Sequence, residues 1–233
     1  MRIRLRSICT AAGISAICLF AAVYAFATRP STYAMYNDYL SAVIEQIAVS
    51  EHSTATVALL GDSQIARSKF ETRLPSVVNY GVEGDTIDGV YLRTPRYRLT
   101  NIKKVVIEVG TNDYTTVGSS FEGIGKRYLR MLRALPPEAQ VISIGILPSR
   151  HSAPWRHPFD KDRITANREI AAACAQHQGC TYLDVCDELA APDGTLLAIY
   201  DSGDHRHISV AAYAVIWKRL QPYLNETSAL RVR

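Results

Sequence analysis

Short, almost wholly apolar runs recur along the chain and alternate with stretches of helical spacing. The runs are rich in β-branched residues and are bounded by glycine, proline or polar residues, which is typical of strands buried on both faces of a parallel sheet. They predict strands at residues 55–60, 76–80, 104–109, 140–147 and 181–185. Apolar positions three and four apart predict helices near residues 121–135, 160–177 and 209–220.

This alternation predicts an α/β fold: a three-layer α/β/α sandwich with a central parallel sheet of about five strands. A chain of 233 residues is long enough for one such domain, which we place at residues 53–233. Apolar positions with helical spacing between Tyr36 and Ile47 predict an amphipathic helix within residues 30–52, with its apolar face packed on the domain.

The first 29 residues predict an N-terminal hydrophobic helix. Residues 7–27 carry no charge and follow three arginines, and about 20 apolar residues suffice to cross a bilayer. We expect a signal-anchor, a transmembrane helix that holds an exported domain at the inner (cytoplasmic) membrane of the cell envelope. Residues 25–27 (Ala-Phe-Ala) also resemble a cleavage site, so a removed signal peptide and a secreted or periplasmic protein stay open.

Charge and cysteine content narrow the function classes. The net charge is +4, of which Arg2, Arg4 and Arg6 supply three, so the rest of the chain carries +1 and offers no basic surface for nucleic acid. The three cysteines of the domain, at positions 174, 180 and 186, do not follow a zinc-site spacing. One disulfide and one free thiol fit this odd number in an exported domain, and the pairing is left open.

Polar clusters follow four of the predicted elements. Three come directly after strands, at residues 61–63 (GDS), 79–86 (NYGVEGDT) and 110–113 (GTND), and one precedes the last helix at residues 201–207 (DSGDHRH). Ligands of open parallel sheets bind outside the carboxyl ends of the strands, so these clusters are expected to meet at one edge.

The clusters contain complementary chemical groups. Ser63 can act as a nucleophile if a base lies within hydrogen-bond reach and a third group orients that base. His207 and Asp204 can take these two roles. The backbone N–H of Gly84 and the side-chain amide of Asn112 can stabilise an oxyanion.

These motifs resemble the SGNH (GDSL-type) hydrolase superfamily of serine esterases and lipases. GDS, N-x-G-x-x-G-D-T, G-T-N-D and D-x-x-H match its four blocks in order, and the similarity spans roughly residues 53–223. The resemblance implies a flavodoxin-like fold of the kind already predicted. The G-x-S-x-G motif of the α/β-hydrolase nucleophile elbow is absent from the chain.

The resemblance also implies a role for each site residue. Ser63 would be the nucleophile, His207 the general base and Asp204 its orienting carboxylate. The backbone N–H groups of Ser63 and Gly84 would form the oxyanion hole with the Asn112 side chain. Gly84 is preferred to Gly81 because the family's donor is the glycine before D-T.

One position departs from the family pattern. The last block usually reads D-G-x-H, and His205 replaces this glycine. His205 therefore competes with His207 as the base, and Asp201 lies four residues before it. Asp204 and His207 are preferred because they keep the family spacing.

Two further groups of residues need an interpretation. The segment SRHSAPWRHPFD, residues 149–160, should overhang the same sheet edge, where Trp155 and Arg156 can contact substrate; a solvated loop is the alternative. Each of the three aspartates in the first three motifs, Asp62, Asp85 and Asp113, is expected to bond nearby backbone N–H groups and to bind no metal.

We therefore expect a serine esterase with no cofactor and an acyl-ester substrate. Export and the absence of a broad apolar lid favour a small acyl group, such as acetyl on a cell-envelope carbohydrate. Hydrolysis of lysophospholipids or thioesters is the enzymatic alternative, and transfer of the acyl group to a glycan is open. A catalytically silent, membrane-anchored binding protein on the same fold is the alternative from another class.

Overall fold

The computed structural model describes residues 30–116, 121–150 and 157–225. The chain divides into two compact units, Met1–Ile44 and Glu45–Arg233, and the second contains the whole sheet. The predicted N-terminal hydrophobic helix lies outside the described residues. No helix within the described part combines the length and apolar character needed to cross a membrane.

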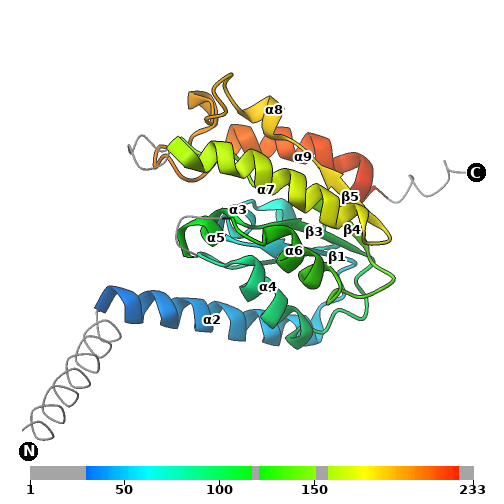
Figure 1. The fold of residues 1–233 in the computed structure, drawn as a ribbon. Helices are drawn as coiled ribbons and strands as arrows, with labels where there is room; N and C mark the ends of the chain where they lie inside the picture. Colours follow the sequence, from blue (N-terminus) through cyan, green and yellow to red (C-terminus); the bar gives the residue numbers. More distant parts are fainter. Residues whose placement is uncertain (1–29, 117–120, 151–156, 226–233) are drawn as a thin grey trace, which may run out of the picture. The chain divides into compact units, whose positions relative to one another are not determined.

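A five-stranded sheet forms the centre of the second unit (Figure 1). Its strands are β1 (Val57–Gly61), β2 (Val77–Gly81), β3 (Lys104–Glu108), β4 (Gln140–Ile144) and β5 (Cys180–Leu183). Their order is β2-β1-β3-β4-β5, and every pair is parallel. Gly61, the last residue of β1, lies opposite both Gly81 and Glu108, so β1, β2 and β3 end at the same level.

Helices cover both faces of the sheet, which confirms the predicted three-layer arrangement. One core cluster joins the sheet to α4 (Ile87–Arg93), α6 (Ile124–Leu132) and α7 (His157–Ala175). The other joins it to α3 (Ser63–Ala66), η1 (Phe70–Thr72), α8 (Cys186–Leu189) and α9 (Val210–Leu224). The remaining described elements are α2 (Pro30–His52), η2 (Thr94–Arg96), α5 (Thr111–Thr116) and η4 (Ala198–Tyr200).

The predicted strands and long helices are present, with ends that differ by up to four residues. The largest difference among the strands is in β4, which ends at Ile144 and not at residue 147. Beyond it, the side chain of Asn167 accepts a hydrogen bond from Ile146 N and donates one to Ile146 O. Residues beyond β4 can therefore stay apolar and buried, because a side chain of α7 satisfies the backbone N–H and C=O of Ile146. Helix α4, with seven residues, was not predicted.

The packing of α2, and one disulfide with one free thiol in the domain, were both expected from the sequence, with the pairing left open. The part of α2 that belongs to the second unit packs on its core through Ile47, as predicted for the amphipathic helix. The apolar positions of α2 up to Ile44 belong to the first unit, and their packing on the domain stays a prediction. Cys174 and Cys180 form the disulfide, and Cys186 is a buried free thiol.

A buried arginine connects the ends of β1 and β2. Arg93, on α4, is 2% exposed. Its Nε donates to Asp85 Oδ2 over 2.6 Å, its Nη1 to Tyr80 O and the Tyr97 hydroxyl, and its Nη2 to Gly61 O over 3.0 Å. A buried guanidinium is stable only when its donors are matched in this way. Arg93 therefore fixes the carboxyl edge of the sheet.

Replacing Arg93 by alanine is expected to lower the free energy of unfolding by about 3–5 kcal/mol, because Asp85 would keep a buried charge without its partner. Urea denaturation measures the change. Arg133→Ala, which removes an exposed arginine at the end of α6, is the control and should cost less than about 0.5 kcal/mol. Equal losses for the two variants would contradict the assigned role.

Candidate active site

Three of the predicted residues form a hydrogen-bonded chain at the carboxyl edge of the sheet. Ser63 Oγ lies 2.9 Å from His207 Nε2, although the two residues are 144 positions apart. On the other side of the ring, His207 Nδ1 lies 2.5 Å from Asp204 Oδ2. Ser63 and His207 are each 8% exposed. This is the order of nucleophile, base and orienting carboxylate that serine hydrolysis requires.

Asp204 is held in its ionised form. Burial acts to raise its pKa, but hydrogen bonds from the His207 side chain, from two backbone N–H groups and from Ser202 outweigh burial and hold the pKa of Asp204 well below its usual value. The backbone donors are His207 N at 2.8 Å and Arg206 N at 2.9 Å. Asp204 therefore stays a carboxylate at any pH at which the imidazole can act as a base.

The turn that carries Ser63 is built by its neighbours. Asp62 caps α3, because its Oδ1 accepts a hydrogen bond of 2.9 Å from Gln64 N. Gly61 is required by close packing, since a Cβ at this position would lie 2.0 Å from Glu108 O and 2.6 Å from Ile65 Cγ1. The strand can thus turn directly into a helix whose first residue is Ser63.

Gln64 ties this turn to the loop that carries His207, and sequence reasoning missed it. Its Nε2 donates to Arg206 O over 3.1 Å, and its Oε1 accepts from Ile208 N over 3.4 Å. These backbone groups lie directly before and after His207. The Tyr213 hydroxyl donates to Gln64 O over 2.7 Å. The sequence carried no signal for this contact, because it depends on two segments that only the fold brings together.

Of the predicted oxyanion donors, Gly84 lies on the loop that follows β2, and Asn112 lies in α5, the helix that follows β3. Gly84 has a left-handed backbone with φ of 76°, and its N–H donates to no group among the described residues. In contrast, the Gly81 N–H already donates to Asn79 Oδ1 over 2.9 Å. Asn112 Nδ2 donates to Asp85 O over 2.9 Å, which places the amide beside the loop of Gly84.

The aspartates of the second and third motifs bind beyond their own turns. Asp85 accepts from Thr86 N, as predicted, and it also pairs with Arg93. For Asp113 the prediction of a local contact was wrong: it accepts from Ile87 N at 3.0 Å and pairs with Arg127. Within the described residues, no three His, Cys, Asp or Glu side chains form a group that could hold a metal ion.

Comparison with known proteins identifies the family. The model of the GDSL-like Lipase/Acylhydrolase family matches residues 60–215. The chain belongs to this family. The chain is therefore a hydrolase acting on ester bonds, and its sheet and helices have the arrangement expected of a GDSL fold.

Relatives are named as acetylhydrolases or have a similar fold. Platelet-activating factor acetylhydrolase IB subunit alpha1 of Rattus norvegicus is 29% identical over 189 residues, or 76% of this chain and 78% of the relative. Subunit alpha2 of Gallus gallus is 31% identical over 166 residues, or 70% of each chain. A GDSL-like lipase from Bacteroides thetaiotaomicron has a similar fold, with a TM-score of 0.67 at 18% identity over 80% of this chain and 96% of that one.

His205 departs from the glycine of the family pattern, and the structure shows what that position demands. Its φ is 61°, in the left-handed region that glycine adopts without strain. The ring lies 2.7 Å from Asp201 Oδ2, as the spacing allowed, and it makes no hydrogen bond to Ser63. His205 therefore belongs to the turn before His207.

Several groups border the triad or were predicted to border it. Arg67 forms two hydrogen bonds to Glu83, and its Nη1 lies 3.8 Å from Asp204 Oδ2, so it adds positive charge beside the carboxylate. Trp155 and Arg156, the predicted substrate contacts, lie outside the described residues, and that assignment stays a prediction.

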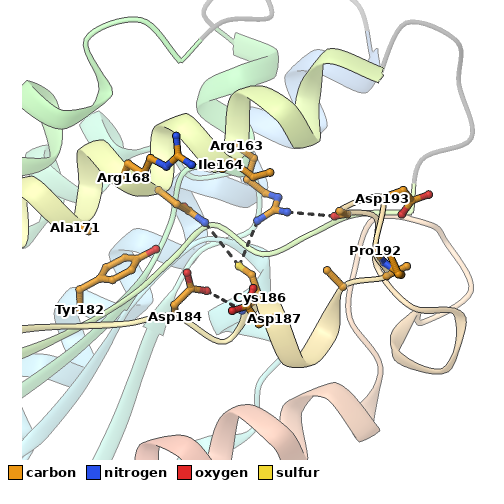
Figure 2. Close-up of a pocket in the computed structure, with 14 residues that line it drawn as sticks. Arg163, Ile164, Arg168, Ala171, Tyr182, Asp184, Cys186, Asp187, Pro192 and Asp193 are labelled. Carbon is orange, nitrogen blue, oxygen red and sulfur yellow. Dashed lines mark hydrogen bonds between the residues drawn. The ribbon is translucent and has the colours of Figure 1, made fainter.

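A cavity of about 770 Å³ lies near the end of β5, and none of Ser63, Asp204 and His207 lines it. Figure 2 shows its lining residues. Figure 2 shows Arg163 reaching toward the sulfur of Cys186, with a distance of 3.3 Å between Nη1 and Sγ. Nη2 of Arg163 donates to Gly194 O. Burial raises the pKa of the Cys186 thiol to about 12, so no thiolate nucleophile forms there near neutral pH. The chain of Ser63, His207 and Asp204, and not this cavity, is therefore the candidate active site.

The two histidines of the last motif can be separated by mutation. His205→Gly is expected to keep kcat/KM within about threefold, because glycine suits the left-handed backbone of this turn. His207→Ala is expected to lower kcat on the order of 10⁴-fold or more, because Ser63 would lose its base. Steady-state hydrolysis of a small chromogenic ester measures both. A His205→Gly protein as inactive as His207→Ala would reverse the assignment.

Proposed function

We propose that the chain is a serine esterase that works through an acyl-enzyme on Ser63. The hydrogen bond between Ser63 Oγ and His207 Nε2, with Asp204 on the far side of the ring, carries this proposal. His207 takes the hydroxyl proton as Ser63 attacks the ester carbonyl carbon. The tetrahedral intermediate expels the alcohol, which receives this proton from His207.

The backbone N–H groups of Ser63 and Gly84 and the amide of Asn112 bind the oxyanion of this intermediate. The Gly84 N–H supports the assignment because no described residue accepts its hydrogen bond. Donors that are already in place limit the reorganisation needed when charge develops, which is the physical basis of such sites.

In the second half-reaction His207 activates the acceptor. A water molecule then attacks the Ser63 ester, and the acid is released as the free hydroxyl of Ser63 is restored. A sugar hydroxyl in place of water gives acyl transfer by the same steps.

The acyl group we propose is small, with acetyl on a cell-envelope carbohydrate as the substrate. The names of the relatives support acetyl, since both are acetylhydrolases. The carbohydrate and the envelope location rest on the predicted export of the domain. The alternative is a lysophospholipid or thioester substrate, which the lipase part of the family description and a membrane anchor would favour.

A panel of esters that differ only in acyl length tests this proposal. We expect kcat/KM for the acetyl ester to exceed that for the octanoyl ester by about tenfold or more, because a small acyl site cannot accommodate the longer chain. Ser63→Ala should lower turnover on the order of 10⁴-fold on every ester. Acetylated glycans in the panel show whether acetate or a new glycan ester is formed.

Ser68→Ala is the matched control, since Ser68 is buried close to the same turn and contacts only local backbone. It should retain turnover on all esters. Preference for octanoyl or palmitoyl esters would replace the small-acyl proposal by the lipid alternative. Full activity of Ser63→Ala would refute the acyl-enzyme itself.

A further inference from the structure

Two carboxyl groups are buried directly beneath the nucleophile, and the reaction described above uses neither. Asp62 precedes Ser63 and has no exposed surface, and Glu108, at the end of β3, is 1% exposed. The register of the sheet brings them together, because Glu108 lies opposite Gly61, the residue before Asp62. Asp62 N also donates to Glu108 O over 3.4 Å.

Three of the four oxygens of these side chains lack an ordinary donor. Asp62 Oδ1 caps Gln64 N, but Asp62 Oδ2 and both carboxyl oxygens of Glu108 have no hydrogen-bond partner among the described residues when both groups are ionised. The Leu147 N–H comes near Glu108 and falls short of ordinary geometry. A side-chain hydrogen bond with Asp62 is one of the causes that raise the pKa of Glu108, and a bond between two carboxyl groups requires a proton.

The charges around Asp62 also favour a proton on this pair of carboxyl groups. Three acidic groups raise the pKa of Asp62 through their charge: Asp85, Asp113 and Glu83. The cations nearby are engaged by those acids, since Arg93 pairs with Asp85, Arg127 with Asp113 and Arg67 with Glu83.

Three titratable groups on the covering helices lie close enough to Glu108 for its charge to act on their pKa, and none of the three is charged near neutral pH. They are Tyr128 on α6, Tyr213 on α9 and Cys186 on α8, and burial raises the pKa of each. Burial, and then the charges of neighbouring acids, raises the pKa of Asp62 to about 7. Burial and the charge of Asp62 raise the pKa of Glu108 well above its usual value.

The geometry points to a positioning role: Asp62 and Glu108 share a proton, and the hydrogen bond between them holds the turn that presents Ser63. One carboxylic O–H donates to the oxygen of the other group, which satisfies two of the three unpartnered oxygens. Neither residue touches the substrate. Their effect passes through the cap that Asp62 provides to the first turn of α3, where Ser63 begins the helix.

The direction of the pH dependence follows from the raised pKa values. The folded protein binds the shared proton more tightly than the unfolded chain, so the stabilisation is complete in acid and is lost as pH rises through the pKa of the folded pair. Two carboxylates at this place would repel each other, and the buried cation nearby, Arg93, is already paired with Asp85. Both stability and the reactivity of Ser63 are therefore expected to decline on the alkaline side.

Amide variants test the shared proton, because an amide donates the same hydrogen bond without titrating. Glu108→Gln places an N–H opposite Asp62, and Asp62→Asn keeps the cap and turns its N–H toward Glu108. The readouts are the rate at which a fluorophosphonate labels Ser63 and the urea midpoint, each measured from about pH 6 to about pH 9. Labelling requires no knowledge of the natural ester.

We expect the labelling rate constant of the wild type to fall about tenfold between about pH 7 and pH 9, which corresponds to one ionisation, and that of Glu108→Gln to fall less than about threefold. The urea midpoint should likewise fall more with rising pH in the wild type than in Glu108→Gln. Glu108→Ala, which leaves Asp62 without a donor, should label slowly at every pH. Glu188→Gln, a change at an exposed carboxyl group, should retain the wild-type profile.

The proposal is overturned if both amide variants decline with pH as steeply as the wild type. It is equally overturned if the wild type shows no alkaline decline in either readout. If an amide variant fails to fold at about pH 6, where the wild-type pair still holds its shared proton and the amide fills the same space, the hydrogen bond is not interchangeable and the shared proton is refuted.

Discussion

One buried cation holds the edge at which the chemistry takes place. The guanidinium of Arg93 bonds the last carbonyl of β1, a carbonyl of β2 and the carboxylate of Asp85. Because a buried charge must keep all its partners, these three segments cannot move independently. The turn of Ser63 follows the first segment, and Gly84 immediately precedes Asp85. The distance between nucleophile and oxyanion donor is thereby set by a group that takes no part in the reaction.

Carboxyl groups at this edge differ in role because their surroundings differ. Asp204 is half exposed and accepts several hydrogen bonds, which keep it ionised beside His207. Asp62 and Glu108 are fully buried and form no ion pair among the described residues, and their raised pKa values favour a retained proton. The same chemical group therefore has two roles: the carboxylate of Asp204 is charged and orients the base, and the protonated pair of Asp62 and Glu108 supports the turn. Only their surroundings differ.

The sequence was sufficient for the layers and for the position of the site. Strands buried on both faces appear as continuous apolar runs, and their carboxyl ends must lie at one edge, so Ser63, Gly84, Asn112 and His207 could be placed from motifs. Contacts between distant segments could not be predicted. Arg93 lies in a helix too short to show a period, and the bonds of Gln64 exist only once α3 meets the segment that carries His207.

The most direct test of this account is a crystal structure of the protein after reaction with a small fluorophosphonate, in which the phosphonyl oxygen takes the place of the oxyanion. We expect a covalent bond from Ser63 Oγ to phosphorus, with that oxygen about 2.7–3.1 Å from the N–H of Gly84 and the amide of Asn112. His207 should remain hydrogen-bonded to Asp204. An adduct on another residue, or a phosphonyl oxygen directed away from both donors, would contradict the account.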